Sequence, residues 1–202
     1  MLFYNFIYLK IIILISLIMI TETLIFLMTF LHFVSNPITV ELSRYKYLSP
    51  MLIYDNNQRL DINNWSRVII SNYFHIDSIH LFLNMIVFYK IGRMIESKLK
   101  PLNYASLIIN LSILVGLLIL MIRIILFGIT NERYLWTHNV LGFSGVLYSL
   151  TYIYLYSIME DHKMVLKNII YELIINTILF PHASFIAHIS GILIGYSFTV
   201  LS

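Results

Sequence analysis

The chain has 202 residues, of which 59% are hydrophobic and only 11% are charged, and its mean hydropathy is +0.84. A soluble domain of this size must leave much of its surface in water, so this composition argues against a soluble fold and indicates a bundle of membrane helices. The net charge of +3 comes from scattered lysines and arginines without a basic run, so no nucleic-acid partner is expected. The lack of cysteine excludes disulfides, thiolate chemistry and cysteine-ligated metals.

Six apolar segments predict six membrane-spanning helices, by the rule of roughly 20 residues per span. In chain order they cover residues 11–33, 78–97, 102–127, 142–159, 165–180 and 184–201. The last three are close to the lower length limit, which indicates helices that start or stop below the membrane surface. Five spans are the alternative, with 165–180 lying partly in the interface. The first segment lacks the charged start and the cleavage site of a signal peptide, so we expect it to remain as a helix.

One long polar segment, residues 34–74, separates the first predicted span from the second. It has few helix signals and is interpreted as an ordered or interfacial loop within a single membrane domain spanning residues 1–202. Basic residues are densest at 93–100, which favours a cytosolic N-terminus. This orientation puts 34–74 on the luminal or outer side and puts 97–101 and 160–163 in the cytosol.

Two polar side chains share one face of the second predicted span. His80 and Asn84 are four residues apart, so they project together, either to join helices by hydrogen bonds or to serve a functional site. A metal site is not expected, because His75 and His80 are five residues apart and so point in different directions. No third ligand is evident.

The fourth predicted span begins with the sequence Gly142-Phe143-Ser144-Gly145. A helix N-terminus has free N–H groups and a positive dipole end, and small neighbours let a substrate backbone come close. Ser144 therefore has donors beside it of the kind that an oxyanion requires, although a small-residue packing face is the alternative interpretation. Tyr148, four residues on, lies on the same face as Ser144, where its ring can pack on an imidazole.

The sixth predicted span carries His188, with Gly191 and Gly195 three and seven residues later. These glycines form a stripe that lets the helix approach a neighbour closely, which would bring His188 to a partner. A serine hydroxyl needs a base to become a nucleophile, and His188 can be that base and later the acid for the leaving amine. No carboxylate is placed to complete a triad. We therefore expect a two-residue pair, with Tyr148 steadying the imidazole ring and with the oxyanion held by Ser144 N–H, Asn84 and His80.

In combination, these motifs resemble those of the rhomboid intramembrane serine proteases. The resemblance rests on His-x4-His-x3-Asn at 75–84, Gly-x-Ser-Gly at 142–145 and Ala-His-x2-Gly-x3-Gly at 187–195, in this order in spans two, four and six. It implies an all-α, polytopic, rhomboid-like bundle of six transmembrane helices with a Ser144–His188 dyad. The residues expected to support the oxyanion are His80, Asn84, Gly142, Phe143 and Tyr148, and those expected to pack helices are Gly145, Gly191 and Gly195.

The activity that the resemblance implies is that of a serine endopeptidase that cleaves transmembrane segments of membrane proteins, without a cofactor or a metal. Its expected partners are transmembrane protein substrates and membrane lipid. Segment 34–74 would be the membrane-associated first loop, and span five with Phe180–Phe185 would form the gate for substrates. "GFSGVLYSL" and "SFIAHISGILIGY" are most similar to rhomboids of the endoplasmic reticulum, so that membrane is the expected location. Another endomembrane or the plasma membrane is the alternative.

Three other functions are alternatives to this one. An inactive, client-binding rhomboid relative would have lost the serine or the histidine, and both are present. A small transporter predicts paired repeats or broken helices, and neither is seen in the sequence. An aspartyl intramembrane protease needs two membrane aspartates, whereas the aspartates here fall outside the spans or at their ends.

Overall fold

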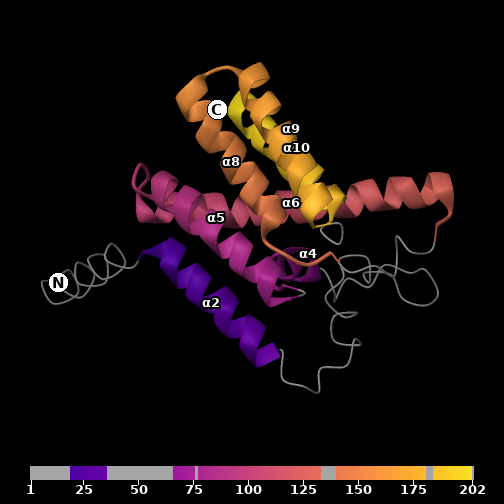
Figure 1. Ribbon diagram of the computed structural model, residues 1–202, viewed down its shortest axis with the longest axis horizontal. Helices are drawn as coiled ribbons and strands as arrows, with labels where there is room; N and C mark the ends of the chain where they lie inside the picture. The colour runs from indigo at the N-terminus through magenta and orange to yellow at the C-terminus, as the bar shows by residue number, and fades with distance from the viewer. Residues whose placement is uncertain (1–18, 36–65, 76, 133–139, 181–183, 202) are drawn as a thin grey trace, which may run out of the picture.

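The structure is a computed structural model that describes residues 19–35, 66–75, 77–132, 140–180 and 184–201. All regular structure in these ranges is helical (Figure 1). The elements are α2 (Ile20–Ser35), α4 (Ser66–Ile70), the 3₁₀ helix η3 (Ser71–Tyr73), α5 (Ser78–Glu96), α6 (Pro101–Thr130), α8 (Ser144–Met159), α9 (His162–Leu179) and α10 (Phe185–Leu201). Six of them are long, and each overlaps one predicted span, so the all-α helical bundle is confirmed.

The helices have the apolar surfaces that a bilayer requires. By length and composition, α5 and α6 can each cross a membrane, and α2 and α10 contain shorter apolar stretches. Large apolar side chains face outward along the bundle, including Phe26 on α2, Ile129 on α6 and Ile178 on α9. In water such a surface would favour aggregation, whereas in lipid it needs no cover.

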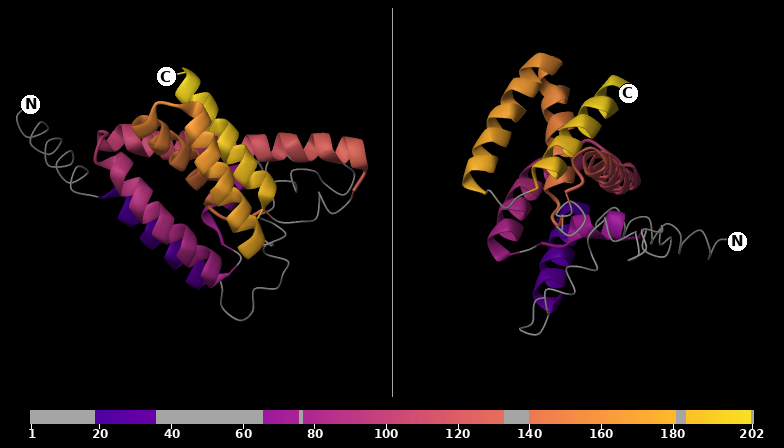
Figure 2. Two further views of the ribbon diagram at one scale, coloured as in Figure 1. Left: turned by 45° about the horizontal axis from the view of Figure 1, so that its top comes forward. Right: turned by 90° about the vertical axis from the view of Figure 1, so that its right-hand side faces the viewer.

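α2 packs antiparallel along α5 (Figures 1 and 2). At one end Glu96, at the end of α5, caps α2: its carboxylate accepts hydrogen bonds from the N–H groups of Ile20 (2.6 Å) and Thr21 (3.3 Å). This cap explains why α2 begins at Ile20, inside the predicted span 11–33, of which residues 11–18 lie outside the described ranges. At the other end His32 Nε2 lies 3.0 Å from Ser78 Oγ.

Two other helix ends differ from the prediction for local reasons. α6 continues past the predicted end at 127, because Gly128 in open space weakens a helix by only about 1 kcal/mol without stopping it. Asn131 ends the helix with a left-handed backbone (φ 55°, ψ 23°) and an N–H bond to the Phe127 carbonyl. α9 begins at His162, not at 165, because the Asp161 side chain caps its first N–H groups.

The end of the predicted first loop, 34–74, contains two short helices. Residues 36–65 lie outside the described ranges, but α4 and η3 occupy 66–73 and pack against α6. Gly116 makes this approach possible, because a Cβ there would overlap the Val68 carbonyl oxygen. Asn72 Nδ2 donates to the Ser112 carbonyl (3.0 Å), and Tyr73 Oη lies 2.9 Å from Ser112 Oγ. This end of the loop is therefore fixed to α6.

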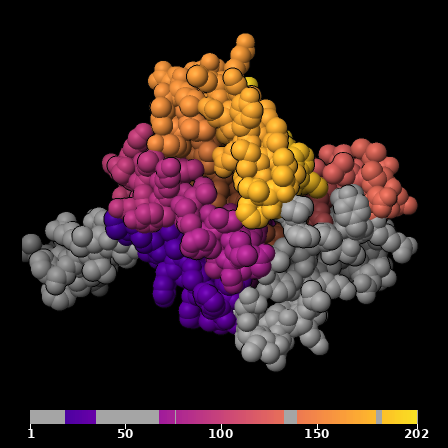
Figure 3. Space-filling view, in the orientation of Figure 1, coloured from indigo at the N-terminus to yellow at the C-terminus, as the bar shows by residue number. Residues whose placement is uncertain are grey.

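The C-terminal helices form the other half of the bundle (Figure 3). α8 and α10 make the most extensive helix pair, and α9 packs on α8 and more lightly on α10. At the α8–α9 connection, the His162 ring stacks on Tyr156 (4.2 Å between centroids) and meets Tyr196 of α10 edge-on (5.0 Å). The C-terminal end of α10 therefore lies beside this connection, and its N-terminal end lies beside the start of α8.

Candidate active site

Ser144 and His188 meet where α8 and α10 begin. His188 Nε2 lies 3.1 Å from Ser144 Oγ, within hydrogen-bonding distance. Ser144 is the first residue of α8 and is half-buried, whereas His188 lies in the first turn of α10 and is buried. The two residues that the sequence paired are thus brought together, although they are 44 positions apart.

The contact depends on the small residues along α8 and α10. A Cβ at Gly191 would overlap the Gly145 carbonyl oxygen, and one at Gly195 would lie 2.6 Å from Tyr152 Cβ. A Cβ at Gly145 would in turn lie 3.0 Å from the Ala187 carbonyl oxygen. Across the seam between α8 and α10, where these glycines lie, Ser149 Oγ donates to the Gly191 carbonyl (2.8 Å). The predicted glycine stripe therefore faces α8 and lets the two backbones touch.

The imidazole of His188 is held by an aromatic ring. Tyr148, one turn after Ser144, places its ring 4.6 Å from the His188 ring at an angle of 38°. Among the described residues, His188 Nδ1 is buried without a hydrogen-bond partner. No described carboxylate orients this nitrogen, so the arrangement is a serine–histidine pair with a tilted tyrosine ring against the imidazole.

Hydrogen-bond donors converge beside the serine. The first helical bond of α8 runs from Leu147 N–H to the Phe143 carbonyl, so the N–H groups of residues 144–146 stand outside the helical ladder. Asn84 Nδ2 is buried and, within the described ranges, unpaired. His80, one turn earlier on α5, lines the same cavity. A carbonyl oxygen that gains negative charge here would meet the kind of donors that an oxyanion needs.

Gly142 gives His80 its place. Its backbone has φ +129°, a conformation that residues other than glycine rarely adopt. A Cβ at this position would lie 2.6 Å from His80 Cε1, so the imidazole occupies the space that a side chain would fill. Phe143 is fully buried, and its ring packs edge-on against Phe88 of α5 (4.9 Å).

His75 belongs to the site in a way that sequence reasoning missed. Its Nε2 accepts a hydrogen bond from Phe143 N–H (3.4 Å), while Gly142 N–H donates to the Ser71 carbonyl (3.2 Å). Its ring also meets the His80 ring edge-on at 5.4 Å. The prediction that these two histidines point in different directions is therefore wrong, because Phe74 is extended (φ −102°, ψ 150°) and His75 precedes α5.

The electrostatics of His75 suit an acceptor. Burial, reinforced by the neighbouring His80 and His32, lowers the pKa of His75 from 6.5 to about 3. The ring is therefore neutral near pH 7 and can accept through Nε2. In the sequence, the only indication of this acceptor role was that His75 is the first histidine of the His-x4-His motif.

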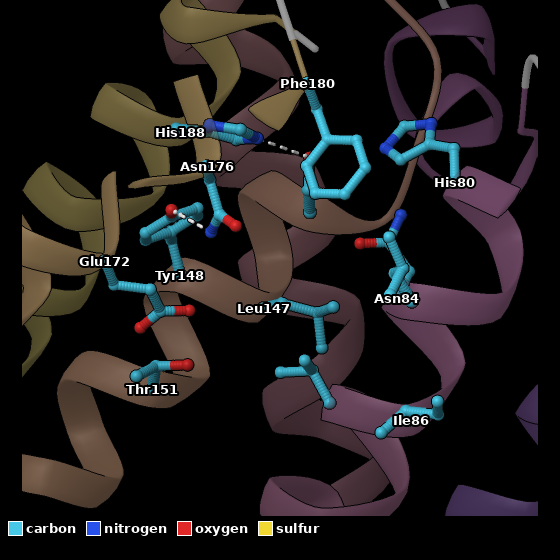
Figure 4. A pocket seen from close by; sticks show the side chains of 13 residues that line it. His80, Asn84, Ile86, Leu147, Tyr148, Thr151, Glu172, Asn176, Phe180 and His188 are labelled. Atoms are coloured by element: carbon cyan, nitrogen blue, oxygen red, sulfur yellow. Dashed lines mark hydrogen bonds between the residues drawn. The ribbon is translucent and has the colours of Figure 1, made fainter. Parts of the chain in front are cut away.

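A cavity of about 180 Å³ lies between α5, α8 and α9, and Ser144 and His188 are among the residues that line it. Figure 4 shows His188 beside this cavity. Apolar residues Leu83, Ile86, Val87 and Leu147 line it together with Thr151, Glu172 and Asn176. Phe180, at the end of α9, reaches over it between His188 and His80 in this view. Of the predicted gate, residues 181–183 lie outside the described ranges. Within those ranges, no three His, Asp or Glu side chains are grouped to hold a metal ion.

Comparison with known proteins places this geometry in context. The model of the Rhomboid domain family matches residues 63–202. The chain is similar to "Rhomboid-like protein 14, mitochondrial" of Arabidopsis thaliana, at 27% identity over 74% of this chain and 45% of that protein. It is also similar to "Rhomboid-related protein 4" of Rattus norvegicus (27% identity, 68% of this chain, 46% of that protein) and of Homo sapiens (27%, 67%, 45%). The chain thus spans a little under half the length of these curated relatives.

Proposed function

Because this chain belongs to the rhomboid family of membrane proteins, we propose that it is an intramembrane serine endopeptidase that cleaves transmembrane segments of membrane proteins. The observation that carries the proposal is the 3.1 Å contact between His188 Nε2 and Ser144 Oγ, two residues that line a cavity. A structural serine and histidine would not need an adjacent space large enough for a substrate side chain.

The chemistry follows from the placement of these groups. Ser144 Oγ attacks the scissile carbonyl carbon while His188 Nε2 takes the hydroxyl proton. His188 then gives this proton to the leaving amine, which leaves an acyl group on Ser144. A water molecule, deprotonated by His188, hydrolyses the ester and restores the serine.

The negative charge of the tetrahedral intermediate has favourable surroundings. The N–H groups at the start of α8 and the Asn84 amide, which is unpaired among the described residues, supply donors, and His80 lines the same cavity. In addition, the N-terminal ends of α5, α8 and α10 converge here, because His80, Ser144 and His188 each lie in the first turn of their helix. The positive N-terminal end of α8, whose first N–H groups are outside the helical ladder, therefore favours the developing oxyanion.

The experiment is cleavage of a reporter transmembrane helix in liposomes, combined with labelling by a fluorophosphonate probe. Ser144→Ala should abolish both signals and His188→Ala should abolish cleavage, and the double variant should be no worse, because the residues act as one unit. Ser157→Ala is the matched control, since this serine is exposed on the same helix. Normal cleavage by Ser144→Ala would refute the proposal. A wild-type protein that binds the reporter but neither cleaves it nor reacts with the probe would favour the inactive, client-binding alternative.

We propose that the protein resides in the membrane of the endoplasmic reticulum, which contains transmembrane substrates and lipid. The sequences around Ser144 and His188 support this location. The name of the plant relative contains the word "mitochondrial", which makes the mitochondrion the natural comparison. Imaging of the full chain against markers of both organelles decides between them, and co-localisation with the mitochondrial marker alone would exclude the proposal.

A further inference from the structure

The orientation of the His188 ring depends on few contacts. Its Nε2 faces Ser144, but its Nδ1 has no hydrogen-bond partner among the described residues. In a serine protease triad a carboxylate on that nitrogen fixes the ring. In this site the face of the ring rests on Tyr148, at 4.6 Å between centroids. Whatever fixes Tyr148 therefore also fixes the catalytic base.

Tyr148 is itself held from a different helix. Asn176 of α9 donates through Nδ2 to the Tyr148 hydroxyl oxygen, at 2.9 Å (Figure 4). Tyr148 is 5% exposed, and a buried phenol needs such a partner. The link thus runs from α9 through Tyr148 of α8 to His188 of α10.

The part of α9 that carries Asn176 is only lightly attached to the bundle. The buried residues of α9 are Val165, Ile169 and Leu173, all of which precede Asn176. Beyond Leu173, Ile174, Ile175, Ile178 and Leu179 are exposed by 51–72%. Asn176 is half-buried and faces inward from this end, so its bond ties the last turns of α9 to α8.

We propose that Asn176 is a positioning residue that holds the His188 imidazole in line with Ser144 by fixing Tyr148. The base is then correctly oriented only while the last turns of α9 lie against α8. Movement of this end of α9 breaks the bond, and its return restores the base. The inference rests on the proposed protease function and adds a residue to it.

Two single variants and their combination test the proposal. Asn176→Leu removes the amide at similar volume, and Tyr148→Phe removes only the hydroxyl and keeps the ring. Each should lower the fluorophosphonate labelling rate and kcat by a factor of about two to ten, the worth of a single hydrogen bond, with KM nearly unchanged. Because both variants delete the same bond, the double variant should be no slower than the slower single variant.

Asn168→Leu is the matched control. It makes the same substitution on α9, two turns earlier, where the exposed Asn168 amide contacts only Met159 Sδ (3.6 Å) within the described ranges. Its labelling rate should equal that of the wild type. Tyr148→Phe keeps the test valid if Asn176→Leu folds poorly, because it deletes a single oxygen atom.

The results separate this inference from the proposed function. If the wild type reacts at Ser144 but Asn176→Leu or Tyr148→Phe reacts equally fast, the positioning role is wrong and the protease function stands. Effects of the two variants that multiply would likewise refute a shared bond. If α9 acts only as a gate, loosening it should speed cleavage of the reporter and leave labelling by the small probe unchanged, which would also overturn the proposal.

Discussion

Replacement of Gly191 by alanine is the most direct test of how the site is assembled. The added Cβ would overlap the Gly145 carbonyl oxygen and would lie 2.9 Å from both the Gly145 carbonyl carbon and Tyr148 Cβ. Ordinary van der Waals contact begins near 3.4 Å. The crowded atoms belong to the backbone or to a Cβ and cannot rotate away. The helices α8 and α10 must therefore separate by roughly 1 Å or rotate against each other.

This separation acts directly on the proposed dyad. Gly191 lies three residues after His188, on the same turn of α10, so a shift there moves the imidazole away from Ser144. The two atoms are 3.1 Å apart, and an added ångström removes the hydrogen bond. A misplacement of about 1 Å can lower a catalysed rate roughly 10²-fold. We expect a loss of this size, together with a destabilisation of about 1–3 kcal/mol from overpacking.

The measurement is the rate of fluorophosphonate labelling of Ser144, made at a temperature where detergent melting curves show the variant to be folded. Gly128→Ala is the control, because a Cβ at Gly128 meets no atom within 4 Å. That variant should label normally and gain about 0.5–1 kcal/mol in stability, since alanine favours the helix. If Gly191→Ala labels within a fewfold of the wild-type rate, the glycine stripe does not set the reach of His188.

The remaining predictions concern the donors and the histidine behind them. Asn84→Ala and His80→Ala should each lower kcat for the reporter by about 10²- to 10³-fold without abolishing labelling, because one oxyanion donor is lost while the nucleophile and base remain. An unchanged kcat in both variants would show that these α5 side chains do not stabilise the oxyanion. Burial lowers the pKa of His75 from 6.5 to about 3. Between these two pH values His75 therefore binds a proton in the unfolded chain but not in the folded protein. The detergent melting temperature should therefore fall as the pH falls through this window, and His75→Gln should reduce the slope; an equal slope in both proteins would show that His75 is not the group responsible.

The sequence was sufficient to predict features that arise from local periodicity. Apolar runs predicted six long helices, and four-residue spacings put His80 beside Asn84 and Tyr148 beside Ser144 on their respective faces. The glycines three and seven residues after His188 predicted which face of α10 would meet another helix. These inferences depend only on helix geometry and on the cost of polar groups in lipid, so they survive without knowledge of the packing.

Features that depend on distant partners could not be predicted. Nothing near Ile20 indicates that Glu96, 76 residues away, caps the start of α2 there. The extended backbone at Phe74, which turns His75 toward the loop before α8, does not follow from any periodic pattern. Asn176 belongs to a helix with no clear polar face, and its role becomes visible only when Tyr148 is seen opposite it. In each case the missing information is the relative placement of helices.

In this bundle the α8–α10 contact is tight, whereas the contact of the last turns of α9 with α8 is loose, and the two contacts have different roles in the proposed protease. Ser144 and His188 lie across the seam in which α8 and α10 touch backbone to backbone, so their separation changes only if the bundle is disrupted. The cavity beside them is lined on one side by the last turns of α9, whose apolar side chains are mostly exposed. A substrate helix needs an entrance that opens, and opening one through the α8–α10 seam would separate the dyad. On the proposal made above, opening along α9 would leave the spacing of the dyad intact and, through Asn176 and Tyr148, would alter only the orientation of the base.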